Sequence, residues 1–302
     1  MIAVLCPGQG SQRPGMLAPW LEVDGARPFL NDLSQAAGIN LLALGVDGSA
    51  ADLKDTAVAQ PLLVAAGLLA WRALAPLHPR VQLVAGHSVG EITAAAVAEA
   101  ISPTDAVRIA ATRGQAMAAA ANQGPATGMS AVVGGDAREV HAAITQAGAF
   151  VANYNGAGQL VASGTKEALA QLAANPPARA RVVPLEVHGA FHTRFMEPAA
   201  QALAAAVADI DFVGPRRTLL SNWDGYPLTK ANAVRRNLVT QLTSPVDWTG
   251  CCDYVSEQGP ELLIELCPAG VLTRIAKRAI PGVAAVALDT PAAVSEVEEK
   301  LA

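Results

Sequence analysis

The chain has 302 residues, of which 52% are hydrophobic and 16% charged, so it can build a large core and is neither a disordered nor a coiled-coil protein. Its formal net charge of -5 argues against a basic surface for nucleic acid or anionic membranes. The four cysteines include no CxxC pair, so they indicate neither a zinc site nor a disulfide framework, and we expect free thiols in a reducing compartment.

The amino-terminal segment, MIAVLCPGQG, has no basic region and too few apolar residues for a signal peptide, and it predicts a buried strand. The longest apolar run begins at Pro61, contains Arg72 and ends at prolines. This length and composition favour a core helix over a membrane span. We therefore expect a soluble protein of the cytoplasm.

In the first 124 residues, short aliphatic runs alternate with long Ala-rich stretches. This alternation predicts a parallel sheet with helices on both faces. Ser102, with Asp105 three residues later, forms a capping box that begins one of the helices. The predicted strands are 2–6 and 81–86, and the predicted helices are 60–74, 90–100 and 102–121.

The pattern changes after Gly124, where six short elements follow in the order β-α-β-β-α-β. This order is typical of the ferredoxin-like fold. We predict an α/β protein of two subdomains. The hydrolase-like large subdomain, with a central parallel sheet, comprises 1–124 and 190–302. A ferredoxin-like (βαββαβ) small subdomain is inserted at 125–189. Such an insertion favours a ligand cleft between the two parts. The small-subdomain elements are strands 128–135, 150–155, 158–164 and 180–187 and helices 136–148 and 165–175; the later large-subdomain elements are helices 197–210, 231–244 and 271–280, a strand and turn at 218–225, and a strand within 261–270.

The segment GHSVG, residues 86–90, lies between a predicted strand and a predicted helix, which is the context of a nucleophile elbow. Gly86 and Gly90 leave room for a sharp turn, and the Val89 amide at the helix N-terminus would face a developing oxyanion. We interpret Ser88 as a nucleophile, and the alternative is a glycine-flanked turn without chemistry.

A serine nucleophile needs a base, and the chain has five histidines. Three are poor candidates, because one lies between prolines, one adjoins the serine and is expected to point away, and one lies in the predicted helix 136–148. These three are His78, His87 and His141. His188 and His192 remain, in the segment that returns from the small to the large subdomain, and chemistry alone does not choose between them.

The chain resembles the malonyl-CoA:acyl carrier protein transacylases of type II fatty acid synthesis and the acyltransferase domains of polyketide synthases, over nearly its whole length. Eight segments in this order form a specific signature, although the family's usual GPG near the C-terminus is CPAG here (267–270). The segments are PGQGSQ (7–12), TAVAQPLL (56–63), AGHSVGE (85–91), TRGQAM (112–117), NYNGAGQLVASG (153–164), GAFHT (189–193), QLTSPVDW (241–248) and PAGVLTRIAKR (268–278).

The resemblance implies roles for five residues at matching positions. Ser88 would be the nucleophile and His192 its general base. The backbone carbonyl of Gln241 would hold the other histidine nitrogen, in place of the aspartate of hydrolase triads. Gln9 would line the oxyanion site together with the amide of Val89.

Arg113 is expected on a helix stripe with Ile109 and Met117, where a guanidinium among apolar neighbours needs a carboxylate partner, either structural or from a ligand. The resemblance implies that it grips the free carboxylate of a malonyl group, which lysine could not hold through two parallel hydrogen bonds. Phe191 would crowd the α-carbon and disfavour a methyl branch. Other residues expected to line the cleft are Gln60, Asn153, Asn155 and Gln159.

The implied reaction is a double displacement from malonyl-CoA to the phosphopantetheine thiol of acyl carrier protein, and it needs no metal or redox cofactor. An acidic carrier protein requires a local basic face, and Arg274, Lys277 and Arg278 lie on one side of a predicted helix. The alternative is that these cations complement the helix dipole. We expect a monomer that binds neither nucleic acid nor membrane.

Other functions remain open on the sequence. The same chemistry would serve a free-standing polyketide acyltransferase or the transacylase subunit of a malonate decarboxylase. A serine esterase would need an aspartate partner for its histidine, and we cannot place one. A catalytically silent scaffold that binds carrier protein is disfavoured by the intact set of Gln9, Ser88, Arg113 and His192.

Overall fold

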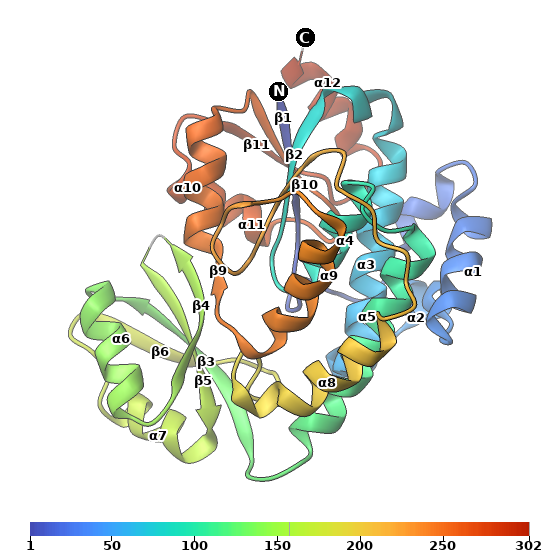
Figure 1. Ribbon diagram of the computed structural model, residues 1–302. Helices are drawn as coiled ribbons and strands as arrows, with labels where there is room; N and C mark the ends of the chain where they lie inside the picture. The colour runs from blue at the N-terminus through green and yellow to red at the C-terminus, as the bar shows by residue number, and fades with distance from the viewer. Residues whose placement is uncertain (157, 302) are drawn as a thin grey trace.

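Two β-sheets organise the chain, a large one of six strands and a small one of five (Figure 1). The computed structural model describes residues 1–156 and 158–301. Ala157, inside the segment 153–164 discussed above, and Ala302 lie outside the described residues. The α/β fold class predicted from the sequence is confirmed.

The large sheet is parallel except at one edge, and its strand order is β11-β10-β1-β2-β7-β8. Strand β1 is central and fully buried, and its residues alternate between two cores on opposite faces of the sheet. A parallel sheet covered on both faces accounts for the largely aliphatic composition of its strands. The strands are β1 (Ile2–Cys6), β2 (Val81–Gly86), β7 (Thr218–Leu220), β8 (Pro227–Leu228), β10 (Leu262–Glu265) and β11 (Ala284–Ala287).

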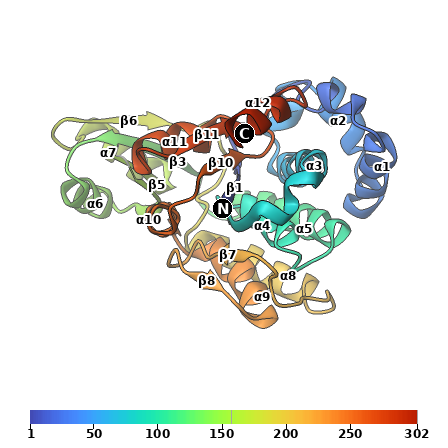
Figure 2. The same cartoon turned by 90° about the horizontal axis from the view of Figure 1, so that it is seen from above.

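Helices cover both faces of the large sheet, with α3, α4 and α5 on one side and α10 and α11 on the other (Figure 2). Among the described residues, α3 alone has the length and composition of a membrane span, but 72% of that window is buried inside the protein, as expected for a core helix. The helices of this part are α1 (Ala26–Ala37), α2 (Leu41–Asp47), α3 (Thr56–Ala73), α4 (Gly90–Val97), α5 (Pro103–Ala121), α8 (Glu197–Ala206), α9 (Ala231–Thr240), α10 (Trp248–Gln258), α11 (Val271–Ala279) and α12 (Ala293–Leu301). The short 3-10 turns are Ala18–Glu22, Asp52–Lys54, Ala75–Arg80, Arg194–Met196 and Gln241–Thr243.

The small sheet has the strand order β6-β3-β5-β4-β9, of which the first four strands are antiparallel and have the ferredoxin-like order. The fifth strand, β9 (Val246–Asp247), comes from the C-terminal third of the chain and pairs in parallel with β4. The small sheet therefore extends beyond the inserted segment, and the boundaries at 125 and 189 stay a prediction. The other elements are β3 (Thr127–Gly134), β4 (Phe150–Gly156), β5 (Gln159–Thr165), β6 (Ala180–Pro184), α6 (Ala137–Gln146) and α7 (Lys166–Ala174).

One helix end differs from the prediction in a way that matters for the site. The helix predicted over 231–244 ends at Thr240, and Gln241–Thr243 form a 3-10 turn. Ser244 is extended, as a residue before proline tends to be, and Pro245 follows it. The turn leaves the carbonyl of Gln241 outside the regular helix, where it accepts a hydrogen bond from a histidine.

Candidate active site

Ser88 lies at the tip of a sharp turn between β2 and α4, with φ 53° in the left-handed region. Both flanking glycines are required by close backbone approach. A Cβ on Gly86 would lie 2.1 Å from the carbonyl oxygen of Gly90, and one on Gly90 would lie 2.1 Å from that of Cys6. A non-glycine residue held at positive φ between such glycines is the geometry of a nucleophile elbow.

His192 contacts the serine, which the sequence alone left undecided between two histidines. The Ser88 hydroxyl donates to His192 Nε2 at 2.8 Å, and His192 Nδ1–H donates to the Gln241 carbonyl oxygen at 2.9 Å. This second bond fixes the tautomer that leaves Nε2 free to accept a proton. His188 is exposed and lies in a different groove.

His192 is a neutral base in this setting. Burial, and secondly the positive charge of Arg113, lower the pKa of His192 to about 3. The imidazole is therefore uncharged at neutral pH, which is the form that can take a proton from a hydroxyl or thiol.

Arg113, on α5, is 1% exposed and directs its guanidinium at the serine. Nη1 donates to Gln60 Oε1 at 2.7 Å, and Nη2 donates to Gln241 Oε1 at 2.7 Å and to Ser88 Oγ at 3.3 Å. Burial lowers its pKa to about 10, and the charge of Glu91 opposes this shift. No carboxylate of the described residues lies within ion-pair distance of Arg113, so the structural ion pair considered above does not form there.

A pocket contains this cluster, and it is lined by strands of the small sheet together with loops and helices that pack on the large sheet. Gln9 lies in the loop after β1 and donates its side-chain amide to Thr56 Oγ1 at 3.2 Å. Val89 is the residue before α4 and is fully buried. Phe191 is 5% exposed and lines the pocket beside His192. The other predicted lining residues, Gln60, Asn153, Asn155 and Gln159, also border it.

Sequence reasoning missed the part that His87 and Asn222 take in the site. His87 lines the pocket, and its Nε2 lies 2.9 Å from Asn155 Oδ1 in the small sheet. Asn222 supports the elbow, because its Oδ1 accepts from the Ser88 amide at 2.8 Å and its Nδ2 donates to the Gly86 carbonyl at 2.6 Å. One signal could have indicated it: Asn222 follows β7, the parallel neighbour of β2, and the carboxyl ends of neighbouring parallel strands meet at one edge of a sheet.

Glu91 is a second missed residue, although the motif AGHSVGE contains it. It is fully buried and accepts from the Asn222 amide at 2.8 Å, from Asn237 Nδ2 at 2.6 Å and from Gln241 Nε2. Burial raises the pKa of Glu91 to about 7, against the opposing effect of these donors and of Arg113.

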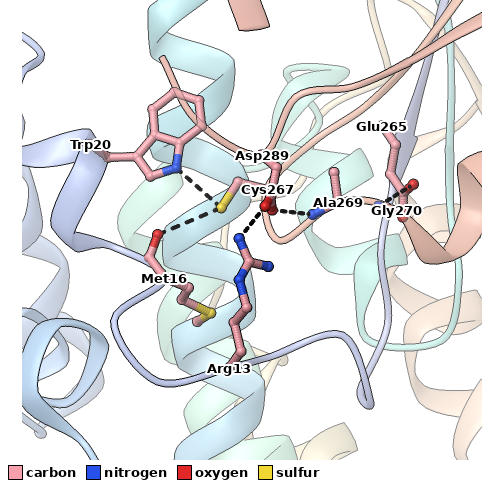
Figure 3. A network of polar contacts seen from close by, with 8 residues as sticks. All are labelled: Arg13, Met16, Trp20, Glu265, Cys267, Ala269, Gly270 and Asp289. Atoms are coloured by element: carbon pink, nitrogen blue, oxygen red, sulfur yellow. Dashed lines mark hydrogen bonds and ion pairs between the residues drawn. The ribbon is translucent and has the colours of Figure 1, made fainter. Parts of the chain in front are cut away.

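A network of polar contacts joins the loop after β1 to the beginning of α11 (Figure 3). Arg13 forms an ion pair with Asp289, which also accepts from the Ala269 amide at 2.9 Å. Glu265 accepts from the Gly270 amide at 2.7 Å and from two further amides in the first turn of α11. Because Val271, Leu272 and Ile275 line the pocket, these contacts fix one of its walls. The segment CPAG thus lies within a well-bonded part of the fold.

The predicted docking residues Arg274, Lys277 and Arg278 are exposed and lie on α11, the helix whose Val271, Leu272 and Ile275 line the pocket. Within residues 1–156 and 158–301, none of the three forms an ion pair. Helix α11 thus carries exposed cations as well as residues that line the pocket.

Comparison with known proteins identifies the family. A family model described as acyl transferase domain matches residues 4–294. The malonyl CoA-acyl carrier protein transacylase of Mycobacterium tuberculosis is 51% identical over 300 residues, which cover 98% of this chain and 99% of that protein. The crystal structure of MCAT from Mycobacterium tuberculosis has a TM-score of 0.95 at 50% identity and covers 98% of this chain and 99% of its own.

A second solved structure is that of a malonyl-transacylase in complex with a type II PKS acyl-carrier protein. It has a TM-score of 0.90 at 32% identity and covers 99% of both chains. The chain belongs to the acyl transferase domain family and, within it, to the malonyl CoA-acyl carrier protein transacylases.

Proposed function

We propose that this protein transfers the malonyl group of malonyl-CoA to the phosphopantetheine thiol of an acyl carrier protein in fatty acid biosynthesis, through a malonyl ester on Ser88. The observation that carries the proposal is the convergence of three groups. The Ser88 hydroxyl lies 2.8 Å from the imidazole of His192 and 3.3 Å from the guanidinium of Arg113. A nucleophile, a base and a carboxylate receptor thus lie within reach of one small diacid thioester.

In the first half of the reaction, Ser88 Oγ attacks the thioester carbonyl carbon while His192 Nε2 takes the hydroxyl proton. The amide of Val89 stabilises the oxyanion, and Gln9, whose side chain is held by Thr56, lines the same site. The C–S bond then breaks, and the imidazolium returns the proton to the departing CoA thiolate. The carbonyl of Gln241 keeps the imidazole oriented throughout.

In the second half, the carrier-protein thiol occupies the position that CoA has left. His192 takes the thiol proton, and the thiolate attacks the malonyl ester. The C–O bond to Ser88 breaks, and the serine oxygen recovers its proton from His192. Atoms and charge balance over the two halves, and no metal or redox cofactor takes part in either.

Selection of the malonyl group rests on Arg113, supported by the side chains of Gln60 and Gln241. A planar guanidinium can bind the free carboxylate of malonyl through two parallel hydrogen bonds. Phe191 limits the space at the α-carbon, and Asn155 lines the wall contributed by the small sheet. We propose these as substrate-binding residues.

The exposed cations of α11 are the proposed docking site for the carrier protein. Arg274 and Arg278 follow the pocket-lining Val271 by three and seven residues, and Lys277 is exposed on the same helix, so an acidic partner bound to these cations would be near the pocket. Reversing the charge at Lys277 and Arg278 is expected to raise KM for carrier protein and to leave KM for malonyl-CoA unchanged. We further propose that the protein is a monomer and that it lies in the cytoplasm; the four free, buried cysteines support a reducing compartment.

One labelling experiment tests the proposed function. The protein is incubated with radiolabelled malonyl-CoA, the labelled peptide is identified, and carrier protein is then added. We expect label on Ser88, its transfer to the carrier thiol, and no label on the Ser88→Ala variant. Rapid release of label to water would indicate an esterase, and no labelling would indicate a silent scaffold. Carrier proteins from fatty acid and polyketide synthesis, compared side by side, identify the pathway served.

A further inference from the structure

A buried carboxylate behind the site has no part in the reaction described above. Glu91 lies in the first turn of α4, three residues after Ser88, and is 0% exposed. Every hydrogen bond that it makes within the described residues comes from an N–H donor: the Asn222 amide, the Asn237 side chain and the Gln241 side chain. A carboxyl proton would have no acceptor among these partners, so the arrangement fits the ionised form.

The side chain of Gln241 bridges this carboxylate and the substrate-binding arginine. Its Nε2 donates to Glu91 Oε2, and its Oε1 accepts from Arg113 Nη2 at 2.7 Å. An amide presents an acceptor on one side and two donors on the other, so the reverse orientation would place its NH2 against the donors of the guanidinium. Because a carboxylate only accepts, Glu91 favours this orientation, and it is the one charged acceptor among the partners of Nε2, which also donates to the Ser88 carbonyl at 3.1 Å and to Asn222 Oδ1 at 3.3 Å.

The amide also separates the two buried charges. Arg113 makes no direct ion pair with the described residues, yet Glu91 is close enough to oppose the effect of burial on its pKa. A carboxylate in direct contact with the guanidinium would compete with the carboxylate of a substrate. The bridging amide thus keeps Arg113 charged and oriented while leaving donors for an incoming anion.

We propose that Glu91 is a positioning residue for malonyl recognition, which fixes the orientation of the Gln241 side-chain amide and thereby holds the Arg113 guanidinium in place for the substrate carboxylate. This inference rests on the proposed malonyl transfer. The proposed role of Glu91 is in selecting the acyl group. The hydrogen bond from His192 to the backbone carbonyl of Gln241 has a different role, because it orients the imidazole for proton transfer.

The test is the ratio of kcat/KM for malonyl-CoA to kcat/KM for acetyl-CoA in Glu91→Gln, at pH 8. The variant keeps the size of the side chain but places an NH2 group against N–H donors. We expect the ratio to fall by about tenfold or more, as for the loss of a hydrogen bond to a charged group. Glu99→Gln is the matched control, because Glu99 follows the other end of α4, is exposed and lies outside the pocket. Its ratio is expected to match that of the parent.

A double-mutant cycle separates positioning from a general structural role. In the Arg113→Ala background, Glu91→Gln is expected to leave the ratio unchanged, because the group that it positions is gone. Equal losses for malonyl and acetyl transfer, or effects on the ratio that simply add in the double variant, would overturn the proposal.

The swapped variant Glu91→Gln/Gln241→Glu covers the case in which Glu91→Gln alone does not fold. The amide and the carboxylate exchange places, so the amide now at position 91 can accept from Asn222 and Asn237. It can also donate to the carboxylate now at position 241, which then pairs directly with Arg113. We expect a folded protein with a low malonyl ratio, and a ratio equal to that of the parent would refute the inference. A parent protein that transfers acetyl but not malonyl would instead contradict the proposed function.

Discussion

Truncation of Arg113 to alanine tests the assignment on which substrate selection depends. The side chain is 1% exposed, and its guanidinium contacts Gln60, Gln241 and Ser88. Removing one partner of a buried, hydrogen-bonded charge pair costs about 3–5 kcal/mol. At 1.36 kcal/mol for each power of ten, kcat/KM for malonyl-CoA should fall about 150- to 5000-fold.

Acetyl-CoA carries no carboxylate, so it leaves the guanidinium desolvated and unpaired in the parent protein. Arg113→Ala should therefore spare or raise acetyl transfer. The assay measures kcat/KM for both thioesters with the same carrier protein. Arg113→Lys is the matched control, because it keeps the positive charge but cannot form two parallel hydrogen bonds. Its kcat/KM for malonyl-CoA should lie between that of the parent and that of the alanine variant.

Loss of the arginine also removes a charge that faces Glu91, so some loss of stability is expected, and the melting temperature should be recorded for each variant. The ratio of the two thioesters is insensitive to the fraction of folded protein. Malonyl kinetics that do not change, or that fall in parallel with acetyl kinetics, would refute the assignment.

Three further predictions concern the base, the thiols and the elbow. Because the pKa of His192 lies near 3 in the fold and near 6.5 unfolded, His192 should lower the free energy of unfolding by about 2 kcal/mol between neutral pH and pH 5; urea titrations should show this as the difference between the parent and His192→Gln, because the opposite contribution of Glu91, whose pKa is raised to about 7, is common to both. Burial raises the pKa of Cys252 and Cys267 to about 12, and all four cysteines are buried, so iodoacetamide at pH 8 should modify none of them before the protein unfolds. Alkylation of the native protein, detected by mass spectrometry, would contradict this prediction. Gly90→Ala should lower stability beyond the ~1–3 kcal/mol of ordinary overpacking, whereas Gly214→Ala, with 3.4 Å to its nearest neighbour, should melt like the parent.

Much of the fold could be predicted from the sequence because its elements have strong periodic patterns. Strands 2–6 and 81–86 are mainly aliphatic, and the βαββαβ order indicates the ferredoxin-like unit. No pattern predicts β9, because two residues carry no periodicity. Helix α10 is also missed, since its sequence, WTGCCDYVSEQ, contains few strong helix formers.

The site was less predictable than the fold, because its geometry depends on contacts between distant segments. The choice between His188 and His192 is made by the packing of the segment against Ser88, 104 residues away in the chain for His192. The partners of Arg113 are amides from α3 and from a 3-10 turn more than a hundred residues later. A motif gives the types of residue in the site, but not which of them touch.

The pairing of β9 with β4 has a mechanical consequence for catalysis. Val246 forms part of the small sheet, and Gln241, whose carbonyl orients the imidazole, lies five residues earlier in the same stretch of chain. Any tilting of the small sheet would pull on that stretch and thereby on the base. A movement of the small sheet would therefore be transmitted to the imidazole of His192 through the five residues of chain between Val246 and Gln241.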